Sequence, residues 1–393
     1  MVDRTSKIHI WAPDLFSFTG GIQAFCRHFI DALHAEIPPS QTRVLIKNDS
    51  LQTALQGEVR YPINACGDWS QPWRTPRFAF ECLRQAQRER PDLLISMHLH
   101  FSPLALAIHE SLGTPYVLMA YGIEAWRNNN IFHQKALRKA DLVLAISRYT
   151  RDWLVERGGV NPDRVQILAP TYTADQFSIH AKPERLLQKY NLTAQTPVIL
   201  TICRLAEDEQ YKGYDQIIKA MPQILSEVPN AHYLLCGKGP DRSRIEKLIA
   251  EVGVQDAVTL AGFVPDEELS DYYNLCDLFA MPSKAEGFGI VYLEALACGK
   301  PVLAGNKDGS RDALADGELG ILVDPDDVGE IAREVIQVLT RQHPHPCIYQ
   351  PELLRKRVIE LFGFRTFQHT LTQYLNDLVS MGPNQARSSY VES

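Results

Sequence analysis

The stretch EGFGIVYLE, residues 286–294, decides the fold of this chain. It follows the short apolar run LFAMPS at 278–283, and its Gly-Phe-Gly turn leads into an apolar helical pattern. A strand, a tight glycine turn and a helix in this order are typical of a parallel α/β sheet. The first amides of such a helix favour a phosphate, and the residues placed to supply them are Gly287, Phe288, Gly289 and Ile290.

Two carboxylates bracket this turn, because Glu286 and Glu294 stand eight positions apart. A phosphate on the turn would repel both acids, so they need another ligand. Ionised carboxylates only accept hydrogen bonds, and sugar hydroxyls donate them. We therefore expect Glu286 to hold a transferred sugar and Glu294, further along the helix, to hold a ribose diol. Alternatively, the helix dipole favours an acidic residue near the N-terminus of the helix. This explanation would account for Glu286 only.

Short apolar runs alternate with helical patterns along both halves of the 393-residue chain. The runs are continuous rather than alternating, as expected of parallel strands covered by helices on both faces. The polar segment 176–196 separates two such series, and we therefore predict two doubly wound α/β domains, 1–178 and 196–363, facing a central cleft, with a tail at 381–393. The predicted strands are 7–13, 43–48, 92–98, 116–122, 142–147 and 165–170, then 197–204, 231–237, 258–263, 278–283, 301–305 and 320–324.

The composition excludes several classes of protein. The net charge is −7, divided as +2 over residues 1–180 and −9 over residues 181–393, so neither half has the basic balance of a nucleic-acid-binding domain. No apolar run approaches the ~18 residues of a membrane span, and the N-terminus lacks a secretory pattern. The eight cysteines are never closer than 16 residues, which excludes a local C-x-x-C site and favours reduced thiols in the cytoplasm.

Other glycines and cations stand where strands end and helices begin. Gly20 and Gly21 precede the first helical pattern, and Gly237 follows a strand in the second half. Such turns let backbone amides approach a phosphate, but ordinary strand-to-helix turns look the same. Arg204 ends a predicted strand and Lys212 opens the next helix. Together they can hold a diphosphate, although Lys-Gly at a helix start is also common.

Five segments in this order resemble retaining GT-B glycosyltransferases, most closely glycosyltransferase family 4. The similarity covers most of residues 7–330 and is densest from 197 to 325. The segments are ADLVLAISRYTRDWL (140–154), CRLAEDEQYKGYDQIIKA (203–220), YLLCGKGPDR (233–242), VTLAGFVPDEELSDYYNLCDLFAMPS (258–283) and EGFGIVYLEALACGKPVLA (286–304), the last with the family's E-x₇-E pattern.

The resemblance implies two Rossmann-like domains, with the acceptor in the first and the nucleotide sugar mainly in the second. A last helix at about 364–380 would cross back to the first domain. Arg204 and Lys212 would hold the diphosphate, Glu294 the ribose and Glu286 the donor sugar. The loop containing Phe263 and Val264 would meet the base.

One segment departs from the family's pattern. Where similar proteins carry a histidine that reaches the donor sugar, this chain reads AYGIE at 120–124. Tyr121 occupies the histidine position, and its hydroxyl is a candidate catalytic contact to the donor sugar. Glu124 is a further substrate-binding candidate. His98 and His100 end the preceding strand and can approach the cleft. The alternative is that each histidine has a structural role and bonds to another group of the protein. We favour this alternative.

We therefore expect a cytoplasmic, metal-independent retaining hexosyltransferase. It would use a UDP-sugar such as UDP-glucose and a glycan or lipid-linked acceptor in polysaccharide biosynthesis, without a nucleic-acid partner. A non-catalytic nucleotide-sugar-binding homologue and a nucleotide-sugar epimerase are the alternatives. The D-x-D in DPDD at 324–327 is typical of metal-dependent transferases of another fold, and we assign no metal to it.

The segment 75–90 predicts a basic helix. Residues 74–90 hold five arginines against Glu81 and Glu89, and the apolar side includes Phe78, Ala79, Cys82, Leu83 and Ala86. A helix of this kind can lie peripherally on the inner face of an anionic membrane. The alternative is an ordinary helix with a solvated outer face, which we favour from the sequence.

Overall fold

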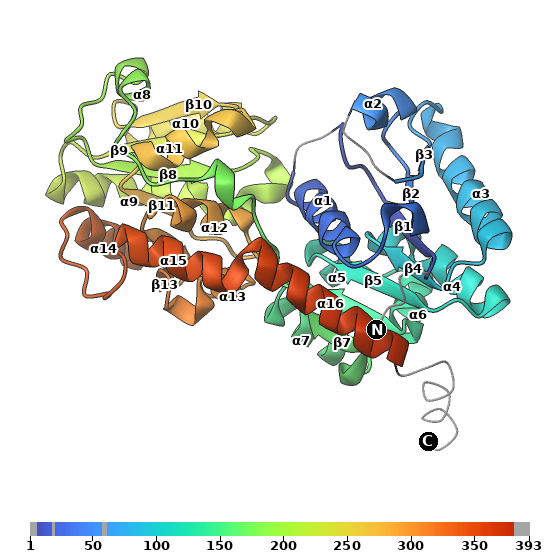
Figure 1. Cartoon of the computed structure of the whole chain (residues 1–393). Coiled ribbons are helices and arrows are strands. Elements are labelled where there is room, and N and C mark those ends of the chain that lie inside the picture. Colours follow the sequence, from blue (N-terminus) through green and yellow to red (C-terminus); the bar gives the residue numbers. More distant parts are fainter. Residues whose placement is uncertain (1–5, 18–19, 57–60, 381–393) are drawn as a thin grey trace. The chain divides into compact units, whose positions relative to one another are not determined.

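The computed structural model describes residues 6–17, 20–56 and 61–380 of the chain. These residues form two compact units, and each is described by itself below (Figure 1). The first unit comprises the chain up to Thr171 together with the segment from Phe364 onward, and the second runs from Tyr172 to Gly363. The predicted tail at 381–393 lies outside the described residues.

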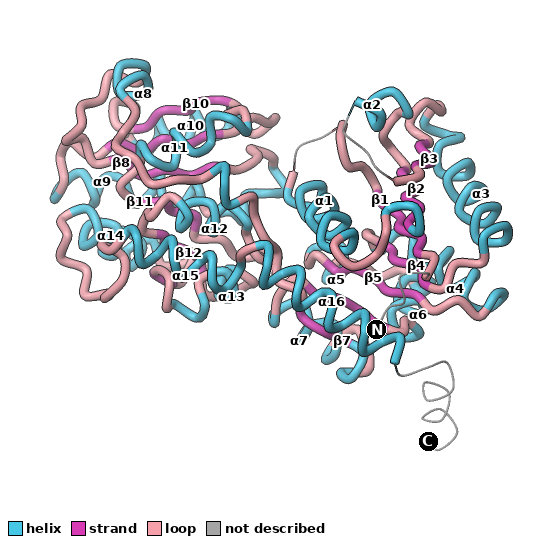
Figure 2. The backbone as a smooth tube through the Cα atoms, viewed as in Figure 1, coloured by secondary structure: helices cyan, strands magenta, loops and turns pink. Residues whose placement is uncertain are grey.

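The first unit is built on a seven-stranded parallel sheet with the strand order β3-β2-β1-β4-β5-β6-β7. All of its strand pairs are parallel, and its central strands are buried on both faces. Figure 2 shows these strands in magenta, with helices in cyan beside them. The strands are β1 (Ile8–Ala12), β2 (Thr42–Ile46), β3 (Ile63–Ala65), β4 (Leu93–Ser96), β5 (Tyr116–Ala120), β6 (Leu142–Ala145) and β7 (Val165–Ile167).

Helices cover this sheet, and their apolar faces pack against it. The stripe of α1, with Phe25, Phe29 and Leu33, is buried as its spacing predicts. The helix α16 packs on α1, where the rings of Phe25 and Phe367 lie edge to face at 5.5 Å. The helices are α1 (Gly21–His34), α2 (Leu51–Gln56), α3 (Gln71–Glu89), α4 (Ser102–Leu112), α5 (Ile123–Trp126), α6 (Ile131–Lys139), α7 (Arg148–Glu156) and α16 (Phe364–Ser380), with short 3-10 turns η1 (Pro39–Gln41), η2 (Leu99–Phe101) and η3 (Pro162–Arg164).

The second unit repeats the scheme with a six-stranded parallel sheet in the order β10-β9-β8-β11-β12-β13. Its strands are β8 (Val198–Ile202), β9 (His232–Cys236), β10 (Val258–Gly262), β11 (Leu278–Met281), β12 (Val302–Gly305) and β13 (Ile321–Val323). The helices are α8 (Glu184–Lys189), α9 (Tyr214–Glu227), α10 (Arg242–Val252), α11 (Leu269–Leu275), α12 (Ile290–Ala297), α13 (Ser310–Ala313), α14 (Val328–Leu339) and α15 (Pro351–Phe362), with 3-10 turns η4 (Ala174–Gln176), η5 (Glu207–Lys212), η6 (Asp266–Glu268) and η7 (Ala315–Gly317).

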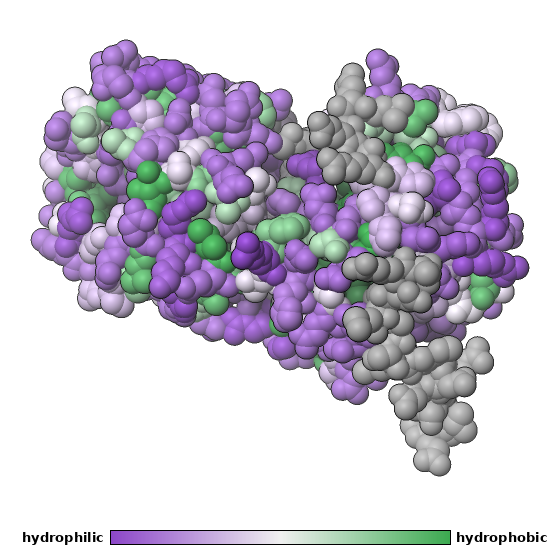
Figure 3. Space-filling model, in the orientation of Figure 1, coloured by the Kyte–Doolittle hydropathy of each residue, from purple (hydrophilic) through white to green (hydrophobic). Residues whose placement is uncertain are grey.

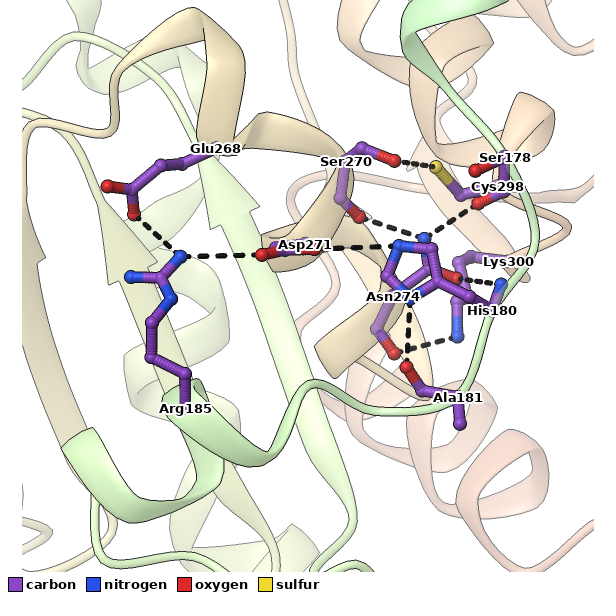
Figure 4. Close-up of polar contacts among 10 residues, drawn as sticks. All are labelled: Ser178, His180, Ala181, Arg185, Glu268, Ser270, Asp271, Asn274, Cys298 and Lys300. Atoms are coloured by element: carbon purple, nitrogen blue, oxygen red, sulfur yellow. Dashed lines mark hydrogen bonds and ion pairs between the residues drawn. The ribbon is translucent and has the colours of Figure 1, made fainter.

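The polar segment between the two series of strands belongs to the second unit, which begins at Tyr172 rather than at the predicted 196. The buried Asn274 of α11 anchors this segment by two hydrogen bonds. Its side chain donates to the Ser178 carbonyl at 2.8 Å and accepts from the His180 amide at 3.0 Å. Arg185 adds ion pairs to two acids of the same region (Figure 4). Specific polar contacts therefore order a segment that has the composition of a linker.

Each unit has its own apolar core between sheet and helices. The face of the molecule in Figure 3 is largely hydrophilic, as expected when the apolar runs form the interior. No helix among the described residues is long and apolar enough to cross a membrane. The two parallel, doubly wound sheets confirm the predicted fold class.

Candidate functional site

The strand order of the second sheet reverses direction between β8 and β11, which are hydrogen-bonded neighbours. Ligands of open α/β sheets bind at the carboxyl ends of the strands at such a point. The loop after β8 contains Arg204 and ends at Lys212, and the loop after β11 contains Glu286 and leads into α12. The sheet topology thus brings together residues that lie more than 70 positions apart.

Four charged side chains meet in these loops. The Nζ of Lys212 lies 2.8 Å from Oε2 of Glu286 and 4.0 Å from Oε2 of Glu209, and Glu209 also accepts a hydrogen bond from Arg204. The side chains of Lys212, Glu286 and Glu209 are only 14%, 18% and 6% exposed, whereas Arg204 is 68% exposed. Two cations are therefore held beside two carboxylates, and Arg204 still reaches solvent.

Lys212 stays charged in this setting. Burial alone would lower the pKa of its ammonium, but the Glu286 carboxylate, together with Tyr211 and Cys203, more than offsets burial and raises that pKa above its usual range. A buried ammonium can hold an anionic ligand as a point charge. The cluster can therefore offer a fixed positive charge to a phosphate.

The backbone around the cluster is tightly packed. At Gly237, where φ is +146°, an added Cβ would lie 1.8 Å from the Cys203 carbonyl oxygen. No side chain fits there, so the loop after β9 can lie directly against the loop after β8. The amide of Leu205 donates to the Lys238 carbonyl at 3.1 Å across the same contact.

The turn that begins α12 presents free amides. Within the part of the chain that the structure describes, the amides of Phe288, Gly289 and Ile290 donate to no protein acceptor. Gly289 has φ +93°, a conformation that favours glycine, and precedes the first helical residue. The Phe288 side chain is buried against Phe362, so only its backbone can face a ligand. Free amides at the start of a helix are groups to which an anion can bind.

A buried aspartate after β12 holds this turn in place. Asp308 accepts from the amide of Glu286 at 2.6 Å and from the amide of Ser310 at 2.9 Å. Burial raises the pKa of the Asp308 carboxyl to about 6 in spite of these bonds. Asp308 therefore fixes the backbone at Glu286, and no pattern in the sequence indicates this role.

Glu294 lies on α12 and accepts a hydrogen bond from the Tyr273 hydroxyl at 2.6 Å. Burial raises the pKa of Glu294 to about 7, although the Tyr273 bond by itself lowers it. The carboxylate retains lone pairs that a diol can occupy. Tyr273 orients Glu294, and its place on α11 gave no signal in the sequence.

The loop after β10 carries an exposed aromatic ring. Phe263 is 55% exposed, and Nζ of Lys238 lies 4.6 Å from the centre of its ring. Val264 is buried, so its side chain cannot contact a ligand. An exposed ring beside a cation is a suitable platform for a planar base.

The first sheet has its own reversal of strand order, between β1 and β4. His98 follows β4, and its Nδ1 accepts the amide of His100 at 3.2 Å, which leaves the proton on Nε2. Burial lowers the pKa of His98 to about 4, with His100, Lys47 and His133 adding to the effect. His98 is therefore a neutral hydrogen-bond donor at this edge of the sheet. Gly20 and Gly21 begin α1 after the strand β1, as predicted.

Tyr121 does not face open space, contrary to the expectation that its hydroxyl is available to a sugar. The side chain is buried, its ring lies edge to face with Phe25 at 5.4 Å, and its hydroxyl is 3.6 Å from Sγ of Cys26. Glu124 accepts the amide of Tyr121 at 2.5 Å, and burial raises the pKa of its carboxyl. Tyr121 therefore packs against α1, and Glu124 holds the backbone just before α5.

The two carboxylates of the D-x-D, Asp324 and Asp326, pair with lysines. Lys307 lies 2.6 Å from Asp324 and 2.9 Å from Asp326, and Lys284 also pairs with Asp326. Among the described residues, no group of three or more histidine, cysteine or acidic side chains is arranged to hold a metal ion.

Comparisons with known proteins agree with this architecture. The family model described as "Glycosyltransferase Family 4" matches residues 19–172, and the model described as "Glycosyl transferases group 1" matches residues 184–352. The first lies in the first unit and the second in the second unit.

Several curated proteins are similar to this chain. The GDP-mannose-dependent alpha-(1-6)-phosphatidylinositol monomannoside mannosyltransferase of Mycolicibacterium smegmatis is 34% identical over 208 residues, which cover 51% of this chain and 53% of that protein. The chain thus spans about half the length of this relative. The D-inositol 3-phosphate glycosyltransferase of Acidothermus cellulolyticus is 26% identical over 79% of this chain and 73% of its own length.

Solved structures share the fold. Anabaena HepE in complex with UDP and glucose superposes with a TM-score of 0.77 at 19% identity, over 94% of this chain and 99% of that one. Sucrose-phosphate synthase from Thermosynechococcus elongatus gives 0.78 at 19% identity, over 96% and 100%. The two family models together match most of the chain, which therefore belongs to the family 4, group 1 glycosyltransferases.

Proposed function

We propose that the chain is a retaining glycosyltransferase that moves a hexose from a UDP-sugar to a hydroxyl of a glycan or lipid-linked acceptor in polysaccharide biosynthesis. One observation carries the proposal: two cations, free amides and two carboxylates surround the carboxyl end of β11. Phosphates suit the cations and amides, and sugar hydroxyls suit the carboxylates. A nucleotide diphosphate sugar has both.

In the proposed complex Arg204, Lys212 and the amides at the start of α12 hold the diphosphate. Glu286 accepts hydroxyls of the hexose, Glu294 accepts the ribose diol, and Phe263 lies against the base. The charge of the leaving diphosphate would then be stabilised by the protein itself, without a metal ion. The proposed reaction forms no covalent bond between the sugar and the protein, so it needs no protein nucleophile.

The proposed reaction is a front-face displacement. The bond between the anomeric carbon and the diphosphate oxygen breaks while the acceptor hydroxyl attacks from the same face. The acceptor's proton passes to the leaving phosphate oxygen, so the product keeps the donor's anomeric configuration. His98 offers a neutral N–H to a sugar hydroxyl, and we assign it this role in place of Tyr121.

GDP-mannose is a second candidate donor. It is supported by the printed name of the mannosyltransferase relative, which aligns with about half of this chain. The UDP proposal draws on the Anabaena neighbour, whose structure contains UDP and glucose. The loop at Phe263 offers a stacking surface that suits either base.

The experiment is incubation of the protein with a panel of UDP- and GDP-linked hexoses, with and without glycan and lipid-linked acceptors. Transfer in the presence of an acceptor supports the proposal. Donor binding without turnover on any acceptor supports a non-catalytic homologue instead. Conversion of the donor without an acceptor supports an epimerase.

A further inference from the structure

The charged cluster of the second unit contains one acid to which the proposed function gives no role. Glu209 lies on η5, the turn that ends at Lys212, and its side chain is only 6% exposed. Glu207 and Asp208 on the same turn are exposed. Burying a carboxylate is costly unless opposite charges and hydrogen bonds compensate for it. Glu209 is therefore held inside the site, whereas its two acidic neighbours are solvated.

Glu209 contacts the same two cations that we assign to the diphosphate. Its Oε1 accepts a hydrogen bond from the Arg204 guanidinium, and its Oε2 lies 4.0 Å from Nζ of Lys212. Lys212 lies closer to Glu286, at 2.8 Å. The two cations and the two carboxylates thus balance one another within the protein.

One oxygen of the Glu209 carboxylate has no hydrogen bond. Within the part of the chain that the structure describes, Oε2 is buried and has no donor at hydrogen-bonding distance. An unpaired buried oxygen destabilises a fold, and native structures contain few of them. We would expect an acid that served only the fold to bond through both oxygens, so stability alone does not explain Glu209.

A carboxylate in this position opposes an anion that binds to the same cations. In the proposed complex Arg204 and Lys212 both hold the diphosphate, so Glu209 lies close to a ligand of its own sign. At separations of a few ångström in a partly buried site, such repulsion lowers affinity by about tenfold or more. Glu286 differs in this respect, because hydroxyls of the hexose donate hydrogen bonds to its carboxylate.

The repulsion acts more strongly on the nucleoside diphosphate product than on the donor. In a nucleotide sugar the terminal phosphate is esterified and carries one negative charge. In the product the same phosphate has a second ionisation, with a pKa of about 6, so it carries more negative charge at pH 7. The proton that it received from the acceptor is lost to solvent in this ionisation. The product also lacks the hexose that contacts Glu286.

We propose that Glu209 is a positioning residue that weakens the hold of Arg204 and Lys212 on the nucleoside diphosphate and thereby speeds the release of this product. This inference rests on the proposed function, which places the diphosphate on these two cations. The hexose contacts keep the donor bound in spite of the repulsion. After transfer those contacts are lost and the charge of the nucleotide rises, so Glu209 favours its dissociation.

The experiment compares the wild type with Glu209→Gln, whose amide oxygen can still accept a hydrogen bond from Arg204. Affinities for UDP and GDP are measured by calorimetry, and their dissociation rates by surface plasmon resonance. We expect the variant to bind the product about tenfold more tightly, mainly through slower dissociation. The gain for the nucleotide sugar should be smaller, and kcat/KM for the donor should not fall. A residue that only held Arg204 in place would show the opposite sign, with weaker nucleotide binding in the variant.

Glu207→Gln is the matched control, because it removes the same charge from an exposed position on the same turn. At physiological ionic strength it should bind and release nucleotide like the wild type. Glu209→Met is a second neutral variant and should also bind the product more tightly, whereas Glu209→Asp keeps the charge and should not. Thermal unfolding identifies the variants that are folded.

Unchanged or weaker binding of the product by either neutral variant of Glu209, once folded, would overturn the inference and leave the proposed function standing. A gain as large in Glu207→Gln or Glu209→Asp would overturn it as well. A wild type that binds neither UDP nor GDP would overturn the inference together with the proposed function.

Discussion

Replacing Lys212 by methionine tests the central cluster of the second unit. The substitution keeps a long side chain but leaves Glu286 and Glu209 without the cation that lies 2.8 and 4.0 Å from them. Removing one partner of a fully buried pair costs about 3–5 kcal/mol. Because these side chains keep a small exposure to water, we expect a loss of about 2–3 kcal/mol in the free energy of unfolding. Turnover should fall further, by ~10²–10³, since the ammonium opposes the charge of the leaving diphosphate.

The assay separates these two effects by restoring the charge balance. Adding Glu209→Gln to Lys212→Met removes one of the two carboxylates beside the lost ammonium. Because Arg204 still pairs with Glu209 in the single variant, the double variant should regain only part of the lost stability. It should not regain turnover at saturating donor. Lys219→Met, at an exposed position on α9, is the matched control and should leave both quantities unchanged. Urea unfolding and kcat are measured for all four proteins. Recovery of kcat in the double variant would refute a role for Lys212 in catalysis, because only folding would then have been impaired.

Three further predictions follow from the same contacts. UDP affinity should fall as pH drops from 8 to 6, since the partly buried Glu294, with a pKa of about 7, must lose its proton to accept the ribose hydroxyls. Calorimetry should find that Glu294→Gln binds UDP more weakly by ~1–3 kcal/mol at pH 8 and lacks this component of the pH dependence. Equal affinity curves for both proteins would show that Glu294 does not bind the ribose. Tyr121→Phe loses only a weak contact to Cys26, so its kcat should stay near that of the wild type. His98→Ala should lower kcat and leave UDP affinity nearly intact. A lower kcat for Tyr121→Phe with an unchanged kcat for His98→Ala would restore Tyr121 as the sugar contact. EDTA should not change turnover, and strict dependence on Mg²⁺ or Mn²⁺ would reopen the assignment of Asp324 and Asp326.

The sheets were predictable because buried parallel strands are continuous apolar runs. Each of the predicted strands is present, and the additional strand β3 was missed because Ile63–Ala65 has only three residues, none fully buried. The position of Arg204, Lys212 and Glu286 at one edge followed from the same pattern, since carboxyl ends of parallel strands share an edge.

The side chains that support the site were not predictable. Glu209 lies in the acidic run EDE, which resembles a solvated loop, yet it is buried between two cations. Asp308 acts through hydrogen bonds to amides from another loop, and such contacts leave no periodicity in the sequence. Tyr121 was misjudged for a related reason: its position at a strand end was correct, but packing on α1 decides where its hydroxyl points.

The most direct test of the proposed donor site is a crystal structure of the protein with UDP. We expect the diphosphate to bind the amides of Phe288 to Ile290 beside Arg204 and Lys212, and the ribose hydroxyls to bind Glu294. Nucleotide bound elsewhere, or bound at this edge with its ribose away from Glu294, would contradict the account.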